Sequence, residues 1–488
     1  MNIYDVLEEF GKTKNRNYTR ARLKDSYNQY VELWRSYYSG NIAGINSDVS
    51  FNGDSFFPIN RQSMKLAKQI ATKWATMLFT EQFKVTLKND TETEKFNELE
   101  KQIDFRSKIN ESAIEGYALG TSALLASADI FRDKETETVT GGKVKLDVVS
   151  YDSLFPLSFD KNDITSIAFV RTEQEKDATI YTISIHTAEG DQVTIETLQA
   201  TVKGENVDFT PAEKITATQT FNNGMYAIIK PNVKNDYSSV LPFGASIFAD
   251  ALASCADIDL AADLLRNDIR DGTQLTFVGK DMVFEGHGKE GEKKKLFDST
   301  RKFYVIPQKL MERGGDIKQI FEKSVPEIRT ETLWKVIKDA LNWACLSSGL
   351  GRGSLDIQVM QTATEVVHTE AEKMQNKSLH EQYLEGQIIS LVKALCELST
   401  LTGNQIDGSE VNITWQDSVV IDTGTEKAHD RLDVEAGLLA SYEYRMKYNG
   451  ETEQEARAKI EEIKKGNDPF EIRRDYSYAR DGFGEMNE

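Results

Sequence analysis

Cysteine is scarce in this chain of 488 residues, and its three cysteines lie far apart in the sequence. There is no CxxC pair and no Cys/His spacing of the kind that holds zinc, which argues against a zinc site or a disulfide framework. We therefore expect three buried thiols in a reducing compartment. They are Cys255, Cys345 and Cys396.

Long apolar runs are also missing. No stretch approaches the roughly 18 apolar residues that a membrane-spanning helix needs. The N-terminus, MNIYDVLEEFGKTK, is acidic and has no apolar centre. We therefore expect neither a signal peptide nor a membrane partner.

Motifs of common enzymes are lacking as well. The sequence has no GxxxxGK[ST] and no GxSxG, and GLGRGS has Ser354 where a dinucleotide-binding loop needs glycine. His380 and Glu381 begin like HExxH, but Leu384 stands at the closing position. We therefore predict that the chain is not an enzyme, with no catalytic residues, no cofactor and no metal.

Positive charge is in deficit: 59 Lys and Arg against 78 Asp and Glu give a net charge of −19. A chain this acidic is a poor candidate for wrapping nucleic acid, which needs clustered cations. Two interpretations are open. The acid excess keeps the protein soluble, or it lines a passage through which DNA slides without sticking.

The first half of the chain contains two predicted helices followed by strands. Apolar periodicity predicts a helix over 60–81, with Asn60 and Ser63 as caps, and a second helix over 105–127. Residues 140–230 are short β-branched runs separated by Gly, Asn and Asp, which is typical of an antiparallel sheet with one solvated face.

Two further helices, 245–270 and 327–348, flank a small insertion with strand-like runs. Asp257 and Asp263 lie on the charged side of the first helix, which is either solvated or faces a lumen. On the second helix, Lys335 and Lys338 lie away from the apolar stripe. Within the insertion, three lysines form a solvated loop tip, or else a docking contact or the positive lining of an opening: Lys293, Lys294 and Lys295.

The longest predicted element runs from Thr362 to Gly403 without a proline. Thr362 and Glu365 fit a capping box, and Gly403 supplies the stop. The helix would be on the order of 60 Å long, so it needs packing partners along its whole length. Its apolar stripe is weak between Met374 and Leu384, where we expect a kink or a change of partner.

The sequence of this helix, TATEVVHTEAEKMQNKSLHEQYLEGQI, resembles the long helix of tailed-bacteriophage portal proteins, in the subgroup typical of long-tailed phages. That subgroup begins the helix with KTATEV or a close variant, and Gln361 takes the first position here. The segment YVELWRSYYSG, with Trp34, Tyr37 and Tyr38, resembles another segment of the subgroup. The order of predicted elements matches the portal arrangement over nearly the whole chain.

The resemblance implies an α+β portal-type fold with long helices, an antiparallel β-rich wing and a small α/β clip insertion. The implied divisions are the wing (1–244, N-terminal helices and β-rich segment), stem helix 1 (245–270), the clip (271–325), stem helix 2 (326–348), the tunnel loop (349–361), the long helix and return strand of the wing (362–422), the crown helices (423–466) and a C-terminal tail (467–488).

The resemblance also implies a function. Portal proteins form a ring of about twelve subunits around a DNA channel at one capsid vertex, and such a closed ring needs head-to-tail interfaces. The expected partners are other copies of the chain, the large terminase subunit, the major capsid protein and scaffold, a head-completion adaptor, and double-stranded DNA bound without sequence specificity. The expected location is the virion, and the host cytoplasm during assembly.

Three groups of residues are implied as functional sites. Two alternatives to the portal function stay open: a non-channel acidic helical scaffold or adaptor of the virion, and a metal-dependent nuclease of the packaging machinery, which no motif predicts. The implied residues are Arg352, Gly353, Ser354, Asp356, Gln358 and Met360 in the tunnel loop; Asp257, Asp263, Lys335 and Lys338 in the stem; and Lys293, Lys294 and Lys295 for docking at the clip.

Overall fold

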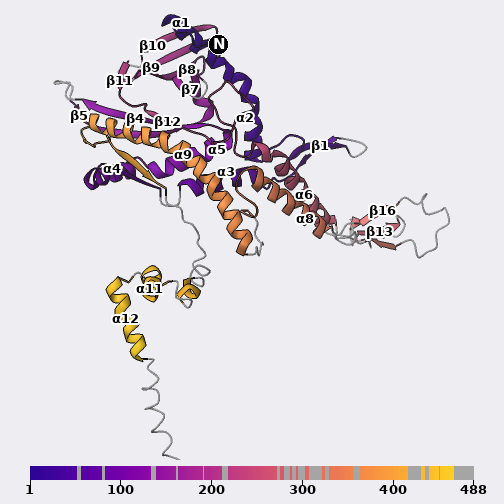
Figure 1. Ribbon diagram of the computed structural model, residues 1–488. Coiled ribbons are helices and arrows are strands. Elements are labelled where there is room, and N and C mark those ends of the chain that lie inside the picture. Colours follow the sequence, from indigo (N-terminus) through magenta and orange to yellow (C-terminus); the bar gives the residue numbers. More distant parts are fainter. Residues whose placement is uncertain are drawn as a thin grey trace, which may run out of the picture. The chain divides into compact units, whose positions relative to one another are not determined.

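The chain forms two compact units, Met1–Trp415 and Gln416–Glu488. The computed structural model (Figure 1) describes residues 1–51, 56–79, 83–132, 139–160, 163–190, 192–211, 218–271, 275–279, 286–287, 293–294, 303–306, 321–324, 329–355, 363–415, 430–434, 439–449 and 451–466.

Both units contain helices. Those of the first unit are α1 (Ile3–Thr13), α2 (Leu23–Ser39), α3 (Leu66–Phe79), α4 (Asp90–Gln102), α5 (Phe105–Leu119), α6 (Leu252–Asp271), α8 (Thr330–Ser347) and α9 (Ala363–Leu401), with short turns η1 (Thr19–Arg22), η2 (Tyr151–Ser153) and η3 (Ala249–Ala251). The second unit includes α11 (Ser441–Asn449) and α12 (Glu453–Gly466).

The described strands all belong to the first unit. They are β1 (Ser47–Phe51), β2 (Phe56–Asn60), β3 (Lys84–Leu87), β4 (Ser122–Arg132), β5 (Val139–Val149), β6 (Leu154–Asp160), β7 (Asp163–Gln174), β8 (Thr179–Glu189), β9 (Gln192–Lys203), β10 (Asn206–Pro211), β11 (Thr218–Phe221), β12 (Tyr226–Ile229), β13 (Leu275–Gly279), β14 (Gly286–His287), β15 (Lys293–Lys294), β16 (Phe303–Ile306), β17 (Phe321–Ser324) and β18 (Val411–Thr414).

Antiparallel pairing prevails, and the predicted α+β class is confirmed. One sheet has the order β10-β9-β8-β7-β6, with β11 also pairing with β9, and a second has the order β12-β4-β5. Strand β18 pairs with β3, so the segment after α9 returns to the N-terminal part of the chain. In the insertion between α6 and α8, β13 pairs in parallel with β16 and antiparallel with β17.

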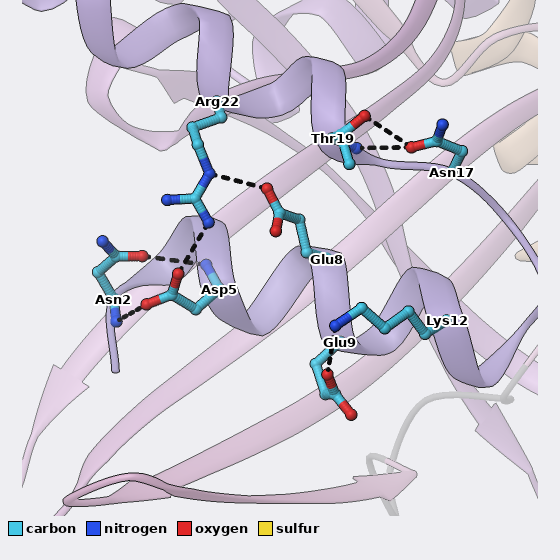
Figure 2. Close-up of polar contacts among 8 residues, drawn as sticks. All are labelled: Asn2, Asp5, Glu8, Glu9, Lys12, Asn17, Thr19 and Arg22. Atoms are coloured by element: carbon cyan, nitrogen blue, oxygen red, sulfur yellow. Dashed lines mark hydrogen bonds and ion pairs between the residues drawn. The ribbon is translucent and has the colours of Figure 1, made fainter.

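Local hydrogen bonds define the N-terminal helix (Figure 2). The Asn2 side chain accepts from the amide of Asp5, and the Asp5 carboxylate accepts from the amide of Asn2, so the start of α1 is a capping box. Arg22 then donates to both Asp5 and Glu8, at 2.8 Å each. This fork holds η1 against α1, and the apolar side of α1 packs on the larger sheet, with Leu7 and Phe10 in the same cluster as residues of β8 and β9.

Two predicted helix boundaries are wrong. The helix expected over 60–81 begins at Leu66, because residues 56–60 pair as β2, and Asn60 is therefore not a cap. The helix expected over 105–127 ends at Leu119, and β4 follows. Gly120 forms the turn between them with φ +86, and a Cβ there would lie 2.2 Å from the carbonyl oxygen of Gly244. Only glycine fits this close approach.

The long helix α9 is confirmed, and its C-terminal half is buried. It contacts β12, β4, β5 and β18, and the edge strand β12 is covered because the Ile228 amide donates to Gln387 Oε1 at 3.1 Å. The predicted stop is also present. Gly403 has φ +97, and the Asn404 amide donates to the Ser399 carbonyl, which is a Schellman ending. The start at Thr362 lies outside the described residues.

All three cysteines are buried and none forms a disulfide. In the part of the chain that the structure describes, no helix is both long enough and apolar enough to cross a membrane.

Lys24 of α2 is buried, with 2% of its surface exposed. Its Nζ donates to the carbonyl oxygens of Tyr151, at 2.8 Å, and Asp152, at 3.0 Å, and lies 3.9 Å from the ring centroid of Phe155. Desolvation by burial lowers the pKa of Lys24 to about 7.

We expect this lysine to make stability rise with pH between about 7 and 10.5. In that window the unfolded chain binds a proton that folded Lys24 has released, so the free energy of unfolding increases with pH. In Lys24→Met this contribution is absent. From the lower to the upper end of the window, the free energy of unfolding of the native sequence should therefore rise by on the order of a few kcal/mol relative to that of the variant. Guanidinium unfolding at both ends of the window measures the difference. Lys12→Met, at an exposed lysine, is the control, and its free energy of unfolding should depend on pH as that of the native sequence does. If the free energy of unfolding changes equally with pH in the two variants, Lys24 does not have the lowered pKa.

Candidate functional site

Helices α6 and α8 pack side by side as a hairpin, with the strands β13 to β17 inserted between them in the chain (Figure 1). Arg329, at the start of α8, forms two hydrogen bonds to the Asp268 carboxylate near the end of α6, at 2.9 and 2.8 Å. The helices are therefore antiparallel, and the Arg329 hydrogen bonds lower the pKa of Asp268. Small buried residues permit close packing: Cys255, Ala261, Ala262, Ala340, Ala344 and Cys345.

The two aspartates predicted to act in the stem lie in different surroundings. Asp257 is exposed. Asp263 is partly buried, and its Oδ2 lies 3.1 Å from Arg61 Nε, so an arginine from the segment before α3 neutralises it. Asp259, between them, is buried and accepts hydrogen bonds from Asn46 and from the Met64 amide. Part of the acidic side of α6 therefore serves internal structure.

The surface of the α6–α8 hairpin includes exposed apolar side chains as well as charged ones. Lys335 is exposed and Lys338 is half-buried, as the sequence indicated. Beside them, however, Trp334 is 46% and Trp343 is 62% exposed. The exposed apolar residues of the hairpin are Leu260, Leu264, Ile269, Trp334, Val336 and Trp343.

These apolar residues lie on more than one side of the hairpin. Trp334 and Trp343 are nine residues apart, which at 3.6 residues per turn places them about 180° apart around α8. Val336 shares the side of Trp343. On α6, Leu260 and Leu264 share one side, four residues apart, and Ile269 lies elsewhere. Neither tryptophan was predicted to be exposed from the sequence. Val336 and Trp343 lie on one side of α8 and both are exposed, so apolar periodicity alone does not show that this side is uncovered.

The loop after α8 begins with a rigid turn. The Gly349 amide donates to the Leu346 carbonyl, and the Leu350 amide to the Cys345 carbonyl, which is a Schellman ending with Leu350 fully buried. Gly349, Gly351 and Gly353 all have φ near +75°. Every second residue from Gly349 to Gly353 therefore has a left-handed backbone conformation, in which residues other than glycine are strained.

Two side chains from distant helices hold this turn. Trp74 of α3 donates to the Ser348 carbonyl at 2.9 Å, and Asn376 of α9 donates to the Gly349 carbonyl at 3.0 Å. Arg352 is the first exposed residue beyond this anchor. Gly353 and Ser354 follow, half-buried, and the Ser354 hydroxyl donates to the Leu350 carbonyl. The predicted loop residues Asp356, Gln358 and Met360 lie outside the described residues.

Between Met374 and Leu384, where the apolar stripe of α9 is weak, the buried side chains include polar ones that pair with one another or with other elements. Lys377 and Glu381 form an ion pair at 3.3 Å, with both side chains almost inaccessible. His380 Nδ1 lies 2.9 Å from the Tyr117 hydroxyl and accepts from the Asn232 amide at 3.1 Å. Burial lowers the pKa of His380 to about 4, so the ring is neutral at pH 7. A cavity of about 340 Å³ adjoins this network and the Gly349 turn.

Of the three lysines expected at the clip, Lys293 and Lys294 form β15, which pairs with β14, and Lys295 lies outside the described residues. Among the described residues, no group of three or more His, Cys, Asp and Glu side chains is placed to hold a metal ion.

Comparison with known proteins gives one family. The family model of phage portal proteins described as SPP1 Gp6-like matches residues 21–469. No curated protein matches the sequence. Among solved structures, a chain from the neck of a native GTA particle, computed with C12 symmetry, aligns with 10% sequence identity and a TM-score of 0.35. The alignment covers 78% of this chain and 87% of that chain.

The Asn376 anchor predicts a measurable effect on the loop. Asn376→Ala removes the donor to the Gly349 carbonyl, a neutral hydrogen bond with a net contribution of about 1 kcal/mol. Amides between Gly349 and Ser354 should therefore exchange with deuterium about fivefold faster in the variant, as measured by mass spectrometry. Gln375→Ala, at the exposed neighbouring position, should leave that exchange unchanged. Equal exchange in both variants would show that Asn376 does not restrain the loop.

Proposed function

The chain belongs to the family of SPP1 Gp6-like phage portal proteins, and we infer from its structure how it builds the channel of that family. A portal protein forms the head–tail connector and its DNA channel in the virion, and it is structural, not enzymatic. Both the expected function and the expected lack of enzymatic activity are thereby confirmed. The scaffold and nuclease alternatives are set aside.

We propose that the α6–α8 hairpin forms the contact between neighbouring subunits of a ring of about twelve copies. A cyclic ring needs two different surfaces on each subunit, one for each neighbour. The single observation that supports this is the exposure of large apolar side chains on opposite sides of α8, at Trp334 and Trp343. Exposed apolar surface of this kind is typical of interaction sites.

The proposed division of the chain follows the predicted one. An antiparallel helix pair with a small β insertion between its members supports stem helices at 245–270 and 326–348 and a clip at 271–325. The packing of α9 on the sheet β12-β4-β5, and of β18 on β3, supports joining 362–422 to the wing at 1–244. The crown at 423–466 and the tail at 467–488 stay proposals from the resemblance.

The tunnel loop at 349–361 is proposed to reach the DNA from Arg352 onward. The Schellman turn and its anchors fix residues 348–350, so contact with DNA falls to the residues beyond them: Arg352, Gly353, Ser354, Asp356, Gln358 and Met360. Along the stem, exposed Asp257 adds negative charge, whereas Asp263 is neutralised by Arg61 and contributes less. Lys335 and Lys338 would offset some of the repulsion of phosphate.

At the clip, we propose that Lys293, Lys294 and Lys295 contact the large terminase subunit during packaging and a head-completion adaptor afterwards. The major capsid protein and scaffold are proposed partners of the wing, with assembly in the host cytoplasm. Double-stranded DNA would pass without sequence recognition. The net charge of −19 supports this, because it disfavours lasting phosphate contacts.

Two aspartate substitutions test the ring interface. Trp334→Asp and Trp343→Asp should each leave the subunit folded, because both side chains are exposed. Each should prevent ring closure, because a carboxylate in an apolar contact is desolvated without a partner. Each variant keeps one of the two proposed contact surfaces unchanged. An equimolar mixture should therefore form dimers, whereas each variant alone stays monomeric, as measured by mass photometry.

Trp334→Phe and Trp343→Phe are the matched controls, since they keep an apolar ring and should assemble normally. Closed rings from both aspartate variants would show that the hairpin is not the subunit contact. A mixture that behaves like the separate variants would show that the two sides do not bind each other.

The tunnel-loop assignment is tested by deletion of residues 352–360. Rings should still form, because the deletion begins beyond the anchored turn at Ser348–Leu350. DNA packaging or retention should fall, and the DNA content of purified heads measures it. Loss of the ring itself would show that this segment is a subunit contact and not a channel loop.

A further inference from the structure

A two-stranded hairpin, β1–β2, precedes α3 (labelled β1 in Figure 1). Its strands pair from Ser47 and Asn60 at the base to Phe51 and Phe56. An isolated two-stranded hairpin is marginally stable in water, so its position must be set by what holds its base.

The base is fixed to α6 by one buried carboxylate. Asp259 is 3% exposed, its Oδ2 accepts from the Asn46 side chain at 3.0 Å, and its Oδ1 accepts from the Met64 amide at 2.7 Å. Asn46 and Met64 flank the hairpin on its two sides in the chain, so both ends converge on Asp259. Asn46 also accepts from the Ile42 amide, which orients its side chain.

Arg61 adds a second clamp. It donates to the Ile45 carbonyl at 2.7 Å through Nη1 and to Asp263 at 3.1 Å through Nε, and its amide donates to the Asn46 carbonyl at 2.6 Å. Both acids of α6 that the hairpin base engages are thereby satisfied. With this many contacts at its base, the direction of the hairpin is fixed before any partner binds, which lowers the entropic cost of docking.

Strand β2 is mostly apolar in sequence, whereas β1 combines Val49 and Phe51 with polar residues. Val49 is 61% exposed, and the sequence places Phe51, Phe56, Phe57 and Ile59 in the same two strands. A pre-oriented ribbon of this composition is suited to an apolar contact with another surface.

Three other sheet edges of the chain are blocked by side chains. Lys108 donates to the Leu146 carbonyl on β5, and Arg20 donates to the Phe159 carbonyl on β6. Gln387 accepts from the Ile228 amide on β12. Such contacts discourage strand addition at those edges. The described hydrogen bonds between the β1–β2 hairpin and the rest of the chain lie at its base.

We propose that the β1–β2 hairpin is an intersubunit arm that binds a second copy of this chain in the ring. This rests on the proposed function. The occupant is argued from continuity: the base lies on α6 beside Leu260 and Leu264, which belong to the apolar surface of the α6–α8 hairpin. Met64, 46% exposed, lies between that surface and the base of the arm, and Arg266 donates to the Gln62 carbonyl alongside.

Photo-crosslinking from Val49→Cys tests the arm. The substitution replaces one exposed, small side chain by another, and the three native cysteines are buried, so a benzophenone maleimide labels position 49 selectively. Irradiation of labelled, purified rings should give covalent dimers on a denaturing gel. Peptide mapping of the dimer band should then identify the segment of the second copy that position 49 contacts.

The outcomes separate this proposal from the proposed function. Intact rings that give only crosslinks within one chain, or none, would overturn the arm and leave the portal ring standing. The same label in a Trp343→Asp background, which blocks assembly, should give no dimers. Covalent dimers in the Trp343→Asp variant would also contradict the proposed role of the arm, because they would not arise from the ring contact.

Discussion

The burial of α9 against the sheet β12-β4-β5 is the contact on which the rest of the first unit depends. Leu384, Ile388 and Leu391 are fully buried, and burial of such side chains contributes about 1.5–3 kcal/mol each. The same helix carries Asn376, which holds the Gly349 carbonyl. Helix α9 therefore contacts both the β-rich region and the start of the proposed channel loop. A displacement of the sheet would move the helix and, through Asn376, the Gly349 turn.

Local signals in the sequence were sufficient for some boundaries and insufficient for others. The end of α9 at Gly403 and the turn at Gly349 could be anticipated, because a left-handed glycine closes a helix by bonds within its last turns. The end of α5 could not be anticipated. Gly120 must be glycine because Gly244 packs against it, and that neighbour is more than a hundred residues away in the chain.

The candidate site shows the same division. The exposure of Arg352 follows from its place in a glycine-bordered loop, and that of Asp257 from the charged side of its helix. The environment of Asp263 does not follow from local pattern, because its partner Arg61 comes from a segment that a periodicity argument assigned to a helix. Trp343 was overlooked for a related reason. Apolar periodicity does not distinguish a side that packs within the chain from one that stays exposed, and Trp343 shares its side with exposed Val336.

Helix α6 reverses the usual pattern of a solvated helix, in that it buries a carboxylate at Asp259 and exposes Leu264. A buried charge is tolerated only with hydrogen-bond partners, and the base of the β1–β2 hairpin supplies them. The exposed leucine has no such compensation within one subunit. Asp259 and Asp263 are engaged by the base of the hairpin, whereas Leu260 and Leu264 of the same helix are exposed. In the ring contact proposed above, a neighbouring subunit would cover this exposed apolar side, and the hydrogen bonds of Asp259 would still hold the base of the β1–β2 hairpin.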